Sequence, residues 1–98
     1  MASRPEMLQE FYEQVGRNIT LYRQRMGISM TQLAEDIGAH KSAVSRMEKG
    51  KNITLETLCK ISLALDIHPQ LLLQGSFLVS DYEMENYIKQ KKVLRRNE

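Results

Sequence analysis

The sequence that decides the fold is SMTQLAEDIGAHKSAVSRMEKG, residues 29–50, which predicts two short helices joined by a tight glycine turn. Ser29 and Gln32 have the spacing of a capping box, in which two side chains satisfy backbone N–H groups that a helix start leaves without partners. The first helix should therefore begin directly after Ser29. Apolar residues recur at three- and four-residue spacing as far as Ile37, and Gly38 follows where a helix commonly ends on a left-handed residue.

A second helix is predicted where the apolar pattern resumes after the turn. Ala43, Val44 and Met47 form its apolar side, and Gly50 closes it as Gly38 closes the first helix. The remaining side chains are polar and should face water: Lys41, Ser42, Ser45, Arg46 and Lys49. The second helix should therefore be apolar on one side and basic on the other.

This pair of helices resembles the helix-turn-helix of the Cro and lambda-repressor family, also called the Xre family. The resemblance covers roughly residues 15–73. It rests on Leu33, Ala34, Gly38, Val44, Glu48 and Gly50. It implies an all-α fold, in which five helices form a lambda-repressor-like DNA-binding domain. The pattern of residues beyond the resemblance adds a C-terminal extension that contains an additional helix. We expect residues 1–75 to form the domain and residues 76–98 the extension.

Two positions depart from the pattern of this family. The second helix of the motif is the recognition helix. Met30 stands where the family usually has Gln, whose side chain contacts the recognition helix and a phosphate. His40 stands where Ser or Thr usually caps the recognition helix. We therefore expect one DNA contact fewer and a weaker cap, with the motif itself intact.

The resemblance also implies that Arg23 pairs with Glu48, at the end of the recognition helix. Two interpretations of this pair are open. Two solvated charges would contribute less than ~1 kcal/mol to stability. A partly buried pair would instead hold the first helix of the domain against the recognition helix, and loss of one partner would leave the other charge uncompensated.

The composition is that of one helical domain without a membrane segment. The chain has 98 residues, of which 42% are hydrophobic and 27% charged, with only five Gly and two Pro. No run approaches the ~20 apolar residues of a membrane helix, and the N-terminus lacks the apolar core of a signal peptide, so we expect a cytoplasmic protein. The net charge of +2 and the pI near 8.8 permit nucleic-acid binding without arguing for it.

The sequence contains no recognisable motif of an enzyme, a metal site or a cofactor site. A lone Cys59 and two His residues supply neither an internal disulfide nor a zinc set. There is no phosphate-binding glycine loop, no His-Glu-x-x-His sequence and no nucleophile with a base motif. We therefore expect neither catalysis nor a cofactor, and interpret Cys59 as a small core residue.

Helical spacing also predicts the other helices of the domain. Apolar residues recur over residues 7–26, although Gly16 leaves a break or a kink there open. After the motif, a helix capped by a threonine is predicted over residues 54–65, and a short helix over residues 69–73. The inward face of the 54–65 helix is predicted to consist of Leu55, Leu58, Cys59, Ile61, Ser62 and Leu65. Leu63 falls on the side that should be polar, so something outside the five-helix core should cover it.

The extension, residues 76–98, begins with an apolar run at 77–79, and Ser80 with Glu83 then forms a capping box for a further helix. Three roles are open: packing on its own domain, contact with a second copy, or a basic arm that contacts phosphates or a partner protein. Contact with a second copy or a partner is expected from Leu63, Leu71, Leu72, Phe77, Val79, Met84, Tyr87 and Ile88.

The recognition helix is the segment expected to enter the major groove of double-stranded DNA. Its outward residues should read base edges: Lys41, Ser42, Ser45 and Arg46. By resemblance, the DNA backbone should be contacted by the start of the preceding helix and by the following loop: Met30, Thr31, Gln32, Lys49, Lys51 and Asn52. Arg46 is the first choice for base reading, because a guanidinium group pairs with both O6 and N7 of guanine.

The resemblance implies a sequence-specific transcriptional regulator, acting as a repressor, that binds a near-palindromic operator as a homodimer. Two alternatives of similar size are a restriction-modification controller and an antitoxin, which would use the extension to hold its toxin. A further alternative comes from a different class: a protein-interaction module of the same fold that does not bind DNA.

Overall fold

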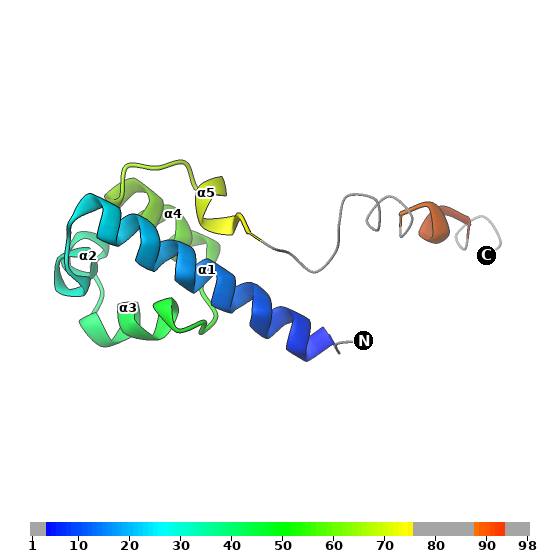
Figure 1. The fold of residues 1–98 in the computed structure, drawn as a ribbon, viewed down its shortest axis with the longest axis horizontal. Coiled ribbons are helices and arrows are strands. Elements are labelled where there is room, and N and C mark those ends of the chain that lie inside the picture. Colours follow the sequence, from blue (N-terminus) through cyan, green and yellow to red (C-terminus); the bar gives the residue numbers. More distant parts are fainter. Residues whose placement is uncertain (1–3, 76–87, 94–98) are drawn as a thin grey trace.

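The computed structural model describes residues 4–75 and 88–93, and the described residues contain helices and no strand (Figure 1). The five helices are α1 (Arg4–Met26), α2 (Met30–Ile37), α3 (Lys41–Glu48), α4 (Leu55–Ala64) and α5 (Gln70–Leu73). A further helical segment covers residues 88–93. The expected all-α architecture of five helices, with an additional helix in the extension, is therefore confirmed.

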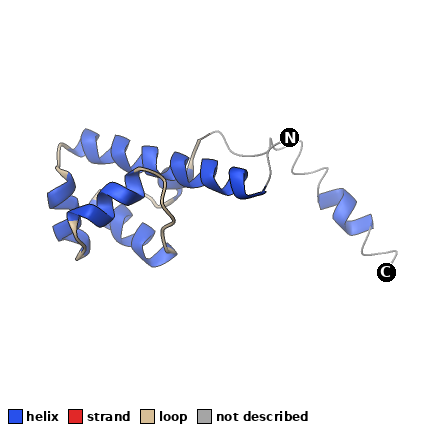
Figure 2. Ribbon diagram, turned by 90° about the horizontal axis from the view of Figure 1, so that it is seen from below, coloured by secondary structure: helices blue, strands red, loops and turns tan. Residues whose placement is uncertain are grey.

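The long helix α1 runs along the whole domain, and its N-terminal turns extend beyond the other helices (Figures 1 and 2). It contacts α3 and α5, while α2 contacts α3 and α4. All five helices contribute to one core, whose buried apolar residues are Val15, Ile19, Leu33, Ala34, Ile37, Val44, Met47, Leu58, Ile61, Leu65 and Leu72. Packing against this core is what stabilises helices as short as α2 and α3, which are marginal in isolation.

The two helices of the motif begin and end as expected, with one difference. Ser29 Oγ accepts a hydrogen bond from the Gln32 backbone N–H at 3.0 Å, and Gly38 ends α2 in the left-handed conformation with φ of 70°. The Gln32 side chain donates to Asp36 Oδ1 at 2.9 Å, so its amide is directed along α2 rather than back to Ser29. His40 makes no side-chain hydrogen bond to the start of α3, as expected of a weaker cap.

The inward face predicted for α4 is wrong at two positions. Leu58, Ile61, Ser62 and Leu65 are buried. Leu55 is 78% exposed and Cys59 is also exposed. The reason is the helical period. When the four buried residues face the core, Leu55, Cys59 and Leu63 lie on another side of α4, which faces outward.

Gly16 lies where α1 crosses the end of α3. A β-carbon at Gly16 would lie 2.5 Å from the backbone oxygen of Glu48 and 2.6 Å from that of Met47. Helix α1 continues through Gly16 without a break, so this residue serves close packing rather than bending. The absence of a side chain lets the two backbones approach each other here.

A buried asparagine attaches α5 to α1. Asn18 is 8% exposed, and its Nδ2 donates to the backbone oxygens of Leu72 at 3.0 Å and Gln74 at 2.5 Å. Its Oδ1 accepts from Gln14 Nε2 at 3.1 Å. Because α5 has only one turn, the carbonyl oxygens at its end have no N–H partner within the helix. Asn18 donates to two of these oxygens instead.

An ion pair between Arg23 and Glu48 joins α1 to the end of α3. Arg23 Nε lies 2.7 Å from Glu48 Oε2, and the two side chains are 10% and 5% exposed. A second guanidinium nitrogen donates to Glu48 Oε1 at 3.1 Å, and the third donates to the backbone oxygen of Ile28 at 2.9 Å. Thr20 Oγ1 donates to Glu48 Oε1 at 2.6 Å. The structure therefore has the buried form of the pair that the resemblance implied.

Replacement of Glu48 by alanine should destabilise the domain strongly. The change leaves the Arg23 guanidinium buried without its counter-charge, so the free energy of unfolding should fall by about 3 kcal/mol and the melting temperature by more than about 10 °C. Glu56→Ala is the matched control, because Glu56 pairs with Lys60 at 3.5 Å with both side chains more than half exposed. Equal melting temperatures for the two variants in circular dichroism would contradict the structural role of the pair.

Gly16→Ala should also destabilise, contrary to the usual effect of alanine in a helix. Alanine normally gains up to about 1 kcal/mol over glycine in a helix interior, but here its β-carbon would meet two backbone oxygens that cannot rotate away. We expect a loss of about 1–3 kcal/mol in urea unfolding, as for an overpacked core. Gln24→Ala, at an exposed position of α1, is the control and should change stability little. A stabilised Gly16→Ala variant would disprove the close approach.

Candidate nucleic-acid interface

The outward face of α3 presents the predicted base-reading residues together. Lys41, Ser42 and Arg46 are exposed and Ser45 is half-buried. Val44 and Met47, on the opposite side of the helix, are 0% and 8% exposed. The apolar side is therefore fixed in the core, and the basic and hydroxyl side chains project from a surface helix.

The start of α2 offers backbone donors more than side chains. The side chain of Met30 is half-buried and packs against the core, so only its main chain is available to a phosphate. The Gln32 N–H already donates to Ser29. An α-helix leaves its first amides without internal acceptors, and in α2 these belong to Met30 and Thr31. Such amides, at the positive end of the helix dipole, suit a phosphate oxygen.

The loop after α3 carries exposed Lys49, Lys51 and Asn52. The Lys51 N–H donates to the backbone oxygen of Arg46 at 3.1 Å, so the loop turns back on the helix. Gly50 has a φ of 95°, and Gln9 Nε2 of α1 donates to its backbone oxygen at 3.3 Å. The two lysines are thus attached to a loop that α1 helps to hold.

This arrangement can bind the grooves and backbone of a duplex. The major groove is wide enough for one α-helix, and Arg, Lys and Ser side chains hydrogen-bond to base edges there. Phosphate oxygens accept from lysines and from helix N-termini, which fixes register without reading sequence. Within the described residues, no three His, Cys, Asp or Glu side chains gather as a metal site.

Three residues that support the site were missed in the sequence. Thr20 donates to the Glu48 carboxylate, Gly16 allows the close approach of α1 and α3, and Asn18 binds the end of α5. The signal for Thr20 was present, because it precedes Arg23 by three residues and so shares its helix face. Asn18 gave no signal, since its partners are backbone atoms distant in the sequence.

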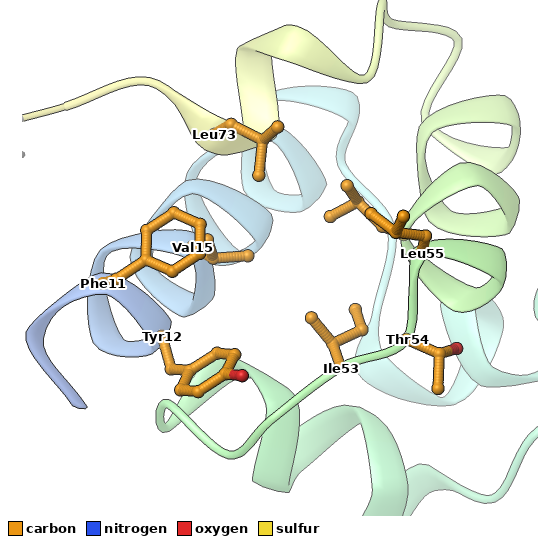
Figure 3. Close-up of a pocket in the computed structure, with 8 residues that line it drawn as sticks. Phe11, Tyr12, Val15, Ile53, Thr54, Leu55 and Leu73 are labelled. Carbon is orange, nitrogen blue, oxygen red and sulfur yellow. The ribbon is translucent and has the colours of Figure 1, made fainter. Parts of the chain in front are cut away.

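An apolar groove lies between the first half of α1, the start of α4 and α5. It has a volume of about 270 Å³. Figure 3 shows side chains from α1 and from the 53–55 segment facing each other across it. It is lined by Phe11, Tyr12, Val15, Ile53, Thr54, Leu55, Leu58 and Leu73.

The residues expected to contact a second copy or a partner have different environments. Leu63 is 80% exposed and Ile88 is 45% exposed, and Leu71 is half-buried. The expectation is wrong for Leu72, whose side chain is fully buried in the core of its own domain. Four of the expected residues lie outside the described part of the chain: Phe77, Val79, Met84 and Tyr87. No helix in the described residues is long and apolar enough to cross a membrane.

Comparison with known proteins identifies the fold and the motif. The helix-turn-helix family model HTH_3 matches residues 19–72, more than half of the chain. A curated relative is the HTH-type transcriptional regulator SlrR of Bacillus subtilis (strain 168), which is 42% identical over 55 residues. That match covers 54% of this chain and 36% of SlrR, so the chain spans about a third of the length of the relative that it matches.

Solved regulators have the same arrangement of helices. The restriction-modification controller protein C.AhdI of Aeromonas hydrophila is 32% identical with a TM-score of 0.61, and the match covers 62% of this chain and 94% of C.AhdI. SinR, the master regulator of biofilm formation from Bacillus subtilis, was solved in complex with DNA. It is 35% identical with a TM-score of 0.58, and the match covers 61% of this chain and 98% of that one. The chain therefore belongs to the Xre, lambda-repressor-like helix-turn-helix family of transcriptional regulators.

Proposed function

We propose that this protein is a sequence-specific transcriptional repressor that binds a near-palindromic operator in the cytoplasm as a homodimer. One observation carries the proposal: the polar and basic face of α3 is exposed, while its other face and its end are fixed to α1 and the core. A rigid, outward helix of this kind suits the major groove. The relatives support it, since SlrR is a transcriptional regulator and SinR was solved with DNA.

In this proposal the exposed residues of the motif divide into two groups. Lys41, Ser42, Ser45 and Arg46 read base edges from α3. The main chain of Met30 and Thr31, the Gln32 side chain and the loop residues Lys49, Lys51 and Asn52 contact the DNA backbone. Base contacts discriminate between sequences, whereas backbone contacts contribute to all of them. The two groups can therefore be separated by mutation.

A single α3 contacts few base pairs, so two copies related by a two-fold axis would read two half-sites. Half-sites on one side of the duplex lie about 34 Å apart, one helical turn, and the two-fold symmetry of the protein makes the operator a near-palindrome. Bound at a promoter, such a dimer represses by occluding the transcription machinery. In this division of labour, residues 1–75 bind DNA and residues 76–98 are available to a second copy or a partner.

A protein partner is the second candidate ligand, and one comparison favours it. SinR was also solved in complex with the protein SinI, and that match covers 80% of this chain and 78% of the other, at 31% identity with a TM-score of 0.60. A regulator, an antitoxin or a controller whose DNA binding depends on a partner would use the same motif. Sizing chromatography of the pure chain, alone and with the product of the neighbouring gene, separates self-association from partner binding.

The proposal predicts different effects for Arg46→Ala and Lys51→Ala. Both residues are exposed cations, so the two variants are matched in charge and should fold normally. Loss of Arg46 should remove discrimination worth about 1–3 kcal/mol at one base pair in each half-site. Loss of Lys51 should weaken binding to all sequences alike and reduce the salt dependence of affinity.

These effects are measured on duplexes selected by the wild-type protein from a random pool, with each base pair varied in turn. Fluorescence anisotropy at several salt concentrations gives the affinity and its salt slope. A uniform loss across all sequences for Arg46→Ala would remove this residue from base reading. Failure of the wild-type protein to enrich any sequence would contradict sequence-specific binding.

A further inference from the structure

The outer side of α4 carries an apolar stripe where a surface helix is normally polar. Its members, Leu55, Cys59 and Leu63, follow one another at four-residue spacing and therefore lie along one face. Leu55 is 78% exposed, Leu63 is 80% exposed, and Cys59 is also exposed. Contiguous exposed apolar surface of this kind is a feature of protein contact sites.

The stripe is continuous with the apolar groove through Leu55, which belongs to both (Figure 3). Leu73 of α5, 40% exposed, lines the far side of the groove. The apolar surface therefore extends from Leu63, along α4, to the hollow between α1 and α5. A protein surface with projecting leucines fits this shape better than a small polar ligand does, because the groove lining is mostly apolar.

We propose that this stripe is the docking surface for a second copy of the chain, with the two α4 helices packed antiparallel about a two-fold axis that passes beside Cys59. The proposal rests on the homodimer of the proposed function and names the surface that forms it. Its first support is symmetry, since Leu55 and Leu63 are equally spaced on either side of Cys59. A two-fold axis there places Leu55 of each copy opposite Leu63 of the other copy. The same surface of both copies therefore forms the contact, as a two-fold interface requires.

The charges beside the stripe are also self-complementary. Glu56 and Lys60 lie along the same edge of α4 and pair with each other at 3.5 Å. An α-helix rises about 1.5 Å per residue. In the antiparallel arrangement, Glu56 and Lys60 of the partner subunit are therefore about 3 Å apart, measured along the helix axis. Lys60 lies one residue from the two-fold axis, so it is also about 3 Å along the helix axis from Lys60 of the partner subunit. The two attractions between Glu56 and Lys60 across the interface therefore outnumber the one close contact between like charges.

The proposed contact lies on a different helix from the base-reading residues. The base-reading side chains project from α3, whereas the stripe lies on α4, and the helix packed between the two is α2. Docking through α4 therefore uses none of the base-reading side chains Lys41, Ser42 or Arg46. Both copies keep a free recognition helix, which a palindromic operator requires.

The native cysteine gives a direct test. Helices pack with their axes about 8–10 Å apart, and each Cα lies about 2.3 Å from its axis, so facing Cys59 Cα atoms can approach to about 5 Å. That spacing lies within the range of a disulfide, about 4.4–6.8 Å. Brief oxidation of the full chain with copper phenanthroline should therefore give a covalent dimer on a non-reducing gel, and Cys59→Ser should give none.

The variant Leu63→Glu separates docking from random collision of thiols. It retains Cys59 but places a charge opposite Leu55 of the partner subunit, so the rate of cross-linking should fall at least tenfold. Leu8→Glu, at a 53% exposed position of α1 outside the stripe, is the matched control and should cross-link like the wild type. Unchanged circular dichroism melting verifies that both variants fold. Equal cross-linking rates for Leu63→Glu and the wild type would overturn the proposal.

A charge-exchange experiment tests whether Glu56 and Lys60 lie at the proposed contact. A mixture of Glu56→Lys and Lys60→Glu chains should cross-link as heterodimers at least tenfold faster than either variant alone, because like charges face each other in the homodimers. Equal rates would contradict the antiparallel arrangement.

DNA binding distinguishes failure of this inference from failure of the proposed function. If the wild type selects a palindrome and Leu63→Glu binds it equally well and with equal cooperativity, the dimer forms through another surface and only the present inference fails. If the wild type cross-links through Cys59 but enriches no DNA sequence, the docking surface holds and the proposed function fails.

Discussion

The ion pair between Arg23 and Glu48 is the interaction on which the orientation of the recognition helix depends. Helix α3 has eight residues and no side-chain cap at its start, so it cannot hold a fixed direction by itself. Its apolar side attaches it to the core, and the pair attaches its end to α1. Burial of two charges is unfavourable unless their hydrogen bonds are satisfied, and here Thr20 and the backbone oxygen of Ile28 supply the remaining partners.

Close backbone packing makes this pair possible. Gly16 brings α1 against the last turn of α3, four residues before Thr20, so the Glu48 carboxylate lies within reach of both Thr20 and Arg23 on one helix face. The same helix also holds the loop through Gln9 and α5 through Asn18. Helix α1 thus holds the end of α3, the loop after it and α5 in place. The side chains proposed to contact DNA do not take part in these contacts.

Much of the fold could be predicted from the sequence, because its signals are local. Caps at Ser29 and Thr54, glycines after helices and the apolar period predict α2 to α5 to within a residue or two, and α1 begins three residues before its first apolar repeat. The orientation of α4 could not be predicted, because apolar residues lie on two of its sides and periodicity alone does not say which side is buried. This is why the prediction of Leu55 and Cys59 as inward residues is wrong. The prediction of Leu72 as a contact residue is wrong for a similar reason, since α5 is a single turn of three leucines and its pattern does not say which of them is buried.

The residues proposed to contact DNA were predicted by resemblance, and the structure adds the reason for their common direction. Their proposed role is most directly tested by nuclear magnetic resonance of the labelled full chain with its selected duplex. The largest amide shift changes should occur at Lys41–Arg46 and at the start of α2, with little change at Leu63. Shift changes concentrated on another face, with α3 unaffected, would contradict that role.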